Sequence, residues 1–437
     1  MNYSDFDTRV GELRQAAVDA YMRGRGWVPE DDLYILNPGT TVLAITRPGP
    51  SGSGGGEAAG PATESVTEEF TVAFSRIYDE IDALVFAWSD LPDPEGVTPV
   101  IASCRQTTQR LSGAAAASAK GLLGAGEIAS YLKLIDQNTV TLSGLTIATF
   151  KAKFLAQLGI VIGGLHTVSL ARGANISAQQ GIWLTARKNV MTVLTKARDS
   201  MRAIGNGETE SVSAVLDVAG WAGRGLALFA SSGVSVAVEV ANLGISILSD
   251  TNARAARATY KAATFDEAMR GLGTALDQLN GQIKDEERAI VANAEQNLAS
   301  VRNSKSSYDL TQPPLATSDG IIVLDRPLVD EIVKAYLPEI AAELEDIAAK
   351  DRDCDASSRV VRSSELGLSA TGPSNSIREL NWQLYKLLKD LAWEVDNGAR
   401  VLSLAIADLM DEDENAAAEL VRLANQITQG APTDPWR

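Results

Sequence analysis

The chain has 437 residues, of which 45% are hydrophobic and only 5% aromatic. This length suffices for two or three compact units with a large core, and the abundance of Ala and Gly favours closely packed helices. The formal net charge of −17 excludes the basic footprint that nucleic-acid binding needs. It also disfavours adsorption to an anionic lipid surface.

The first residues predict a small separate unit, residues 1–46, with a helix at Val10–Met22 and a β-hairpin at 33–46. The hairpin turns at Asn37-Pro38-Gly39, and residues 320–325 could join it as a further strand. Residues 47–63 follow as a flexible Gly/Pro/Ser linker, because this composition offers too little apolar surface to fold. The start of the chain lacks a basic segment followed by an apolar run, so no cleavable secretory signal is predicted.

From residue 64 the helical period dominates, and residues 64–206 are expected to form a helical bundle. One apolar stripe with alternating spacings of four and three consists of Phe70, Phe74, Ile77, Ile81, Leu84 and Trp88. Further helices are predicted at 95–120, 125–140, Thr149–Ala171 and Ala178–Ile204. The sequence Gly205-Asn206-Gly207 is typical of a helix C-cap.

Residues 207–310 are predicted to contain an apolar hairpin and then a long amphipathic helix, Ala253–Val301, with a coiled-coil-like seam from Phe265 to Ile283. Residues 311–437 form a C-terminal helical module with a polar break at Glu365–Asn375. The predicted fold class is therefore all-α: an elongated multi-helix bundle with long antiparallel helices, an apolar helical hairpin, and a minor β-hairpin near the N-terminus.

Catalytic and metal motifs are missing from the sequence. The single histidine, His166, lies among apolar residues of a helix, which favours a buried structural role over that of a general base. The run Asp351, Asp353, Asp355 imitates a calcium loop but lacks its glycine and its final glutamate, so a solvated face is expected. We predict no enzyme, no metal and no cofactor.

Cys104 and Cys354 are the only cysteines. Neither has a neighbour at metal-ligand spacing. The favoured interpretation is that both are small apolar core residues. A disulfide between them is the alternative that the sequence leaves open.

Two segments carry a resemblance to a known family. The first segment is Thr139–Met201, in which a turn at Leu142-Ser143-Gly144 precedes helices that carry the family's motif residues. The second segment is Leu337–Leu420, which ends in an acidic run followed by alanines. The pattern positions that matter most are Gly144, Phe150, Phe154, Trp183 and Arg187, accompanied by Ala148, Leu155, Ile182 and Ala186. The segments resemble the WXG-type helical proteins of actinobacterial type VII (ESX) secretion systems, although Leu142 stands where that family has Trp.

The resemblance implies a non-enzymatic secretion substrate or secretion-associated protein that acts through helix–helix contacts. Its partner would be another helical protein or a second copy of the chain, with a membrane as a further candidate and no nucleic acid. It would be secreted without a cleavable signal peptide, or cytoplasmic before export.

The stretch Ala214–Leu248 has only three charged residues, Asp217, Arg224 and Glu239. A hairpin turning near Ser231 would have arms about 24–28 Å long, just short of the hydrocarbon thickness of a bilayer. Three interpretations stay open: a buried hairpin, a hairpin released into a membrane, or a constitutive span. The second resembles, in outline, helical pore-forming toxins of the cytolysin A type. The candidate core or membrane residues are Trp221, Leu226, Leu228, Phe229, Val236, Val238, Leu243 and Ile247.

Overall fold

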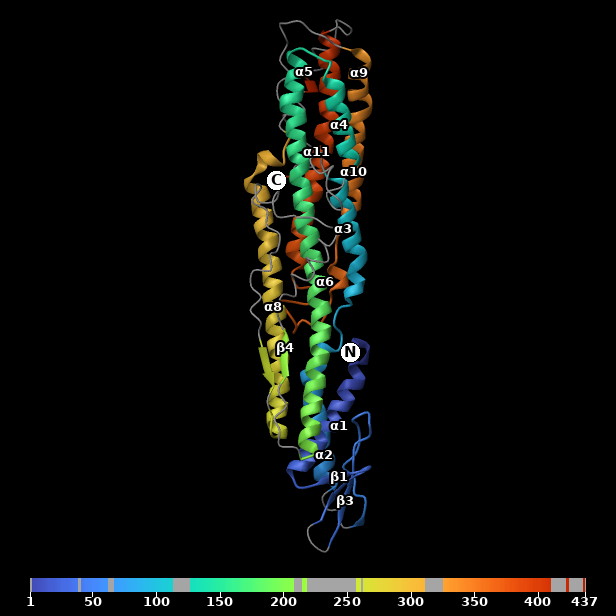
Figure 1. The fold of residues 1–437 in the computed structure, drawn as a ribbon, viewed down its shortest axis with the longest axis vertical. Coiled ribbons are helices and arrows are strands. Elements are labelled where there is room, and N and C mark those ends of the chain that lie inside the picture. The colour runs from blue at the N-terminus through green and yellow to red at the C-terminus, as the bar shows by residue number, and fades with distance from the viewer. Residues whose placement is uncertain are drawn as a thin grey trace.

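The computed structural model describes residues 2–37, 41–61, 67–112, 126–207, 214–217, 257–260, 262–310, 325–409, 422–423 and 435–436. The chain is mostly helical, with a small three-stranded antiparallel sheet near the N-terminus. This confirms the predicted helical class and the minor β element. The long helices run along the longest axis of the molecule (Figure 1). Apart from its first residues, Ala214–Asp217, the predicted apolar hairpin lies outside the described residues.

The main helices are α1 (Phe6–Gly24), α2 (Thr67–Val85), α3 (Thr98–Arg110), α4 (Glu127–Thr139), α5 (Leu145–Thr149), α6 (Ala156–Gly205), α8 (Phe265–Asn303), α9 (Arg326–Glu331), α10 (Leu337–Asp351) and α11 (Ser374–Leu409). Single π-helical turns, Phe150–Leu155 and Ile332–Tyr336, join α5 to α6 and α9 to α10. The strands are β1 (Val28–Glu30), β2 (Leu33–Leu36), β3 (Leu43–Thr46), β4 (Ala214–Asp217) and β5 (Arg257–Tyr260).

Helix α6 is the centre of the structure. It has 50 residues, and every residue from Gly164 to Gln179 is buried. Helices α1, α3, α8 and α11 all pack against it. The prediction of two separate helices in this region was wrong. A segment buried on all sides must satisfy its own backbone hydrogen bonds, and an unbroken helix does so across Gly173.

The β-hairpin at 33–46 is present as β2 and β3, with Tyr34 opposite Ile45. Both outer edges of the hairpin are occupied by described residues, and positions 320–324 of the strand predicted at 320–325 lie outside the described part of the chain. Strand β1 pairs with β2, and Ala58 bridges to Ile45 beside β3.

The segment predicted as a flexible linker instead packs closely on the helices where the structure describes it, residues 47–61. Gly52 has φ +67, and a Cβ there would lie 2.3 Å from the backbone oxygen of Gly11 in α1. Gly56 has φ +92, and a Cβ there would lie 2.8 Å from the backbone nitrogen of Thr71 in α2. The glycines therefore serve close approach and left-handed backbone geometry rather than flexibility.

Helix α8 begins twelve residues later than predicted, at Phe265. The Thr264 side chain accepts a hydrogen bond from the backbone N–H of Glu267, and the Glu267 carboxylate accepts one from the Ala263 N–H. This reciprocal capping satisfies free backbone donors and fixes the helix start.

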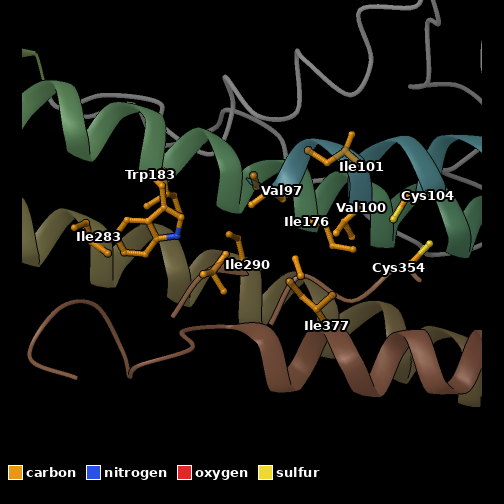
Figure 2. Close-up of a cluster of buried hydrophobic side chains, with 14 of the residues drawn as sticks. Val97, Val100, Ile101, Cys104, Ile176, Trp183, Ile283, Ile290, Cys354 and Ile377 are labelled. Carbon is orange, nitrogen blue, oxygen red and sulfur yellow. The ribbon is translucent and has the colours of Figure 1, made fainter. Parts of the chain in front are cut away.

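The predicted apolar seam of α8 is present in the structure, since Leu272, Leu276, Leu279 and Ile283 are buried. Figure 2 shows Ile283 and Ile290 of α8 beside Trp183 of α6.

A charged network lies at the middle of α6. The Arg172 guanidinium, wholly buried, pairs with the buried Asp351 carboxylate at the end of α10. It also donates to Asn381 Oδ1 of α11 at 2.7 Å and to Thr107 Oγ1 of α3 at 3.0 Å. The expectation of a solvated Asp351 was therefore wrong. Because one side chain bonds to three other helices, it fixes how they are placed along α6.

Cys104 and Cys354 are both buried, with free thiols, and their sulfur atoms point toward each other in Figure 2. Burial raises the pKa of the Cys104 thiol. The hydrogen bond between the two thiols lowers the pKa of Cys354. Their place in the hydrophobic cluster confirms the prediction of two core residues.

Replacing Arg172 by Met should lower the free energy of unfolding by about 3–5 kcal/mol, because Asp351 is then a buried charge without its partner. Urea denaturation measures this directly. The double variant Arg172→Met, Asp351→Leu should lose less than the sum of the two single variants.

The matched control is Arg288→Met, which removes an exposed pair with Asp285 on α8 and should change stability little. A loss below about 1 kcal/mol for Arg172→Met would contradict the structural role of the buried pair.

Candidate functional site

The connection between α6 and α8 contains a strand pair that the sequence did not predict. Strands β4 and β5 are antiparallel, with Ala214 opposite Tyr260 and Asp217 opposite Arg257. The two ends of segment 218–256 are therefore neighbours. This segment carries only four charged residues, namely Arg224, Glu239, Asp250 and Arg254.

The strand pair lies on the side of the bundle. Strand β4 contacts α6 and strand β5 contacts α8, and both strands lie beside the lower part of α8 (Figure 1). Segment 218–256 thus lies, in sequence, between two paired strands within the connection of the two longest described helices, α6 and α8. Its entry and exit lie next to each other.

Two sequence predictions change at this point. Ala214–Asp217, expected as the start of an apolar helical hairpin, is a strand, and so is Arg257–Tyr260, expected inside the long helix. Backbone pairing across the two ends of the segment overrides the local helical pattern there. The candidate residues Trp221, Leu226, Leu228, Phe229, Val236, Val238, Leu243 and Ile247 all lie outside the described residues.

The family-like positions near the turn have structural roles. Gly144 has φ +126 and is the residue before α5, a conformation that favours glycine. The rings of Phe150 and Phe154 stack with centroids 5.3 Å apart. A Cβ on Gly398 of α11 would lie 2.3 Å from the Phe154 ring, so this ring packs directly on the α11 backbone.

Trp183 takes part in a second buried charged group. The Arg362 guanidinium lies 4.5 Å from the centre of the Trp183 ring and pairs with the buried Glu287 of α8. Glu287 Oε2 also accepts a hydrogen bond of 2.7 Å from the Leu368 backbone N–H. Burial raises the pKa of Glu287, and the charge of Arg362 opposes this shift. The group ties α6, α8 and the loop before α11 together.

Arg187 holds the segment that follows α2. Its Nη2 donates to the Leu91 carbonyl oxygen at 2.7 Å and its Nη1 to Asp93 Oδ1 at 3.1 Å. The guanidinium also lies 4.5 Å from the Tyr3 ring centre. Trp183 and Arg187, like the two phenylalanines, thus make contacts within the chain.

One described helix is long and apolar enough to cross a membrane by length and composition, the continuous helical run Thr146–Gly205. Two-thirds of its most apolar window (67%) is buried inside the bundle, as in the core helix of a folded protein. His166 lies in this helix and is buried.

Within the described part of the chain, one group of carboxylates has the spacing of a cation site. Oxygens of Asp309, Asp390 and Glu394 lie within 4.8 Å of one another. Burial, reinforced by the charges of Asp390 and Asp309, raises the pKa of Glu394 to about 10. With this pKa Glu394 holds its proton at neutral pH, and the neutral carboxyl group relieves the repulsion among the three acids.

The sequence located the apolar stretch but missed the strands at its two ends and both buried arginine–carboxylate groups. The sequence did hold a signal for the Arg172 group, because Arg172 is a single charge within an otherwise apolar helical run. Comparison with family models, with curated proteins and with solved structures found no match to this chain.

Replacing Glu394 by Gln should flatten the pH dependence of stability. A carboxyl group whose pKa is about 10 in the folded state and near 4.3 in the unfolded state binds its proton more tightly when folded. The free energy of unfolding should therefore fall as pH rises between about 5 and 9, by up to about 1.4 kcal/mol per pH unit from this group.

Urea denaturation at pH 5, 7 and 9 measures the slope. The Gln variant should lose most of it, and Glu379→Gln on the exposed face of α11 should keep it. An unchanged slope in Glu394→Gln would show that Glu394 ionises normally in the folded protein.

Proposed function

We propose that this chain is a helical membrane-inserting protein and that residues 218–256 carry the insertion. The observation that supports this most is the antiparallel pairing of β4 with β5. This pairing brings together the two ends of the least charged part of the connection, which lies in sequence between two long helices.

The composition of the segment suits a bilayer. From Val218 to Val238 the only charged residue is Arg224, and about 20 largely apolar residues are needed for one helical crossing. A hairpin of two arms would be just short of the hydrocarbon thickness, so a local thinning or assembly of several copies would complete the crossing.

The described bundle has a core of its own. The buried face of α8 contacts α6, and two buried arginine–carboxylate pairs hold α6 to α8, α10 and the loop before α11. Long helices can therefore stay together while the segment between them moves. This arrangement resembles, in outline, the cytolysin A type of helical pore-forming toxin.

Release of dye from phosphatidylcholine vesicles at pH 7 and pH 5 tests the proposal. The wild-type chain should cause release, and Leu228→Glu or Val236→Glu should reduce its rate at least tenfold, because a charge inside the segment opposes transfer into hydrocarbon.

The matched control is Val72→Glu on α2, where the native side chain is 63% exposed; it should release dye like the wild type. Circular dichroism confirms that each variant keeps its helical content. No release by the wild-type chain at either pH, or full release by Leu228→Glu, would refute the proposal.

A second candidate is the non-enzymatic, export-associated helical interaction protein that the type VII resemblance implies. An aromatic pair on α11 favours it: the Trp382 side chain is 57% exposed and stacks on the half-buried Tyr385, with ring centroids 5.1 Å apart. Large exposed aromatics are typical of protein contact sites.

If this pair mediates self-association, light scattering should show an oligomer that Trp382→Ala dissociates. Phe86→Ala, which removes another exposed aromatic, should leave it intact. A monomer at all concentrations would exclude self-association through α11.

A further inference from the structure

A pocket of about 640 Å³ lies at the base of the connection between α6 and α8. Its walls come from the end of α1, from α2, from the end of α6 and from the start of α8. Its lining residues are Ala20, Tyr21, Arg23, Gly24, Arg25, Arg76, Ile204, Gly207, Ala263, Thr264, Phe265 and Asp266. Gly207 precedes β4, and Ala263 follows β5, so the pocket touches the chain on both sides of the strand pair.

The charge of this pocket is opposite to that of the whole chain. Three arginines and a single aspartate line it, whereas the chain as a whole carries a net charge of −17. Tyr21 and Phe265 form an apolar wall, with their rings edge to face and centroids 5.7 Å apart. Screening over about 8 Å at physiological ionic strength leaves the local positive charge effective inside the pocket.

Among the described residues, two of the arginines have only weak, exposed ion pairs. Arg25 pairs with Glu69 at 3.3 Å and lies 4.4 Å from the Tyr21 ring centre. Arg76 and Glu80 approach only to 3.7 Å, and both are well exposed. Exposed pairs of this kind contribute little and exchange readily for another anion.

Arg23 is the pocket arginine for which the described part of the chain offers no charged partner. Among the residues that the structure describes, none forms an ion pair with its guanidinium. A Cβ built on Gly207 would lie 2.6 Å from Arg23 Nη2, so the guanidinium rests against the Gly207 backbone. Its guanidinium is therefore placed at the Gly207 side of the pocket, where no described carboxylate pairs with it.

We propose that this pocket binds a phosphate group between Arg23, Arg25 and Arg76. The planar fork of a guanidinium matches two phosphate oxygens, and the volume admits a phosphate ester beside the aromatic wall. The phosphate comes either from a soluble phosphate compound or from a phospholipid headgroup.

The pocket also suggests how segment 218–256 is controlled, a point that rests on the proposed function. A phosphate bound there contacts Gly207 and the start of α8, the two places where the connection leaves and rejoins the helices. Binding a headgroup at this point would position the segment at a membrane surface.

Isothermal titration of the full chain with inorganic phosphate and with phosphocholine, and co-sedimentation with phosphatidylcholine vesicles, test the proposal. We expect saturable binding that Arg23→Gln weakens at least tenfold and that Arg23→Gln with Arg76→Gln abolishes. Arg288→Gln on the exposed face of α8 should bind like the wild type.

Vesicle binding that depends on Arg23 would assign the phosphate to a headgroup, and binding of the soluble probes alone would assign it to a soluble compound. Absence of saturable binding, or equal binding by Arg23→Gln, would overturn the proposal. Leu228→Glu separates the two hypotheses, because it should lose dye release while it keeps phosphate binding.

Discussion

The burial of the middle of α6, from Gly164 to Gln179, on all its sides is the constraint on which the rest of the structure depends. An apolar helical segment of this kind is stable in water only if other helices cover it, and this requirement brings α1, α3, α8 and α11 around α6. Apolar contacts alone would let the covering helices slide. Arg172 prevents this, because a buried guanidinium must be paired and hydrogen-bonded, and its partners stand at fixed positions on α3, α10 and α11.

Both α6 and segment 218–256 are apolar in the sequence, and the structure describes α6 together with the two ends of the segment. The described helices cover the middle of α6, and the polar residues there are part of the core; Ser169 Oγ, for example, contacts Thr108 Oγ1 at 2.7 Å. Segment 218–256 is instead joined to the bundle through a four-residue strand at each end. This attachment through β4 and β5 is the observation on which the proposal of a membrane segment rests.

Much of the helical architecture could be predicted from periodicity. The stripe from Phe70 to Trp88 is buried on α2 and the turn after it, as expected, apart from half-buried Leu84, and α6 ends at Gly205. Predictions failed where long-range contacts decide the local structure. Gly173 stays helical because its surroundings are buried, the glycine-rich loop is ordered by close approach to α1 and α2, and Asp351 is buried because Arg172 reaches it. The candidate site was only half predictable: charge depletion marks the apolar stretch, but the strands and the arginine pocket form only when residues distant in sequence meet.

The most direct test of the account follows one side chain of the segment during membrane contact. A chain with Cys104 and Cys354 replaced by Ala and with Leu228 replaced by Cys can carry an environment-sensitive NBD label at position 228. We predict a several-fold rise and a blue shift of NBD emission when phosphatidylcholine vesicles are added, with no change for the label at position 72 on α2. Unchanged emission at position 228, under conditions where the labelled chain remains folded and binds vesicles, would contradict the assignment of residues 218–256 as the membrane-inserting segment.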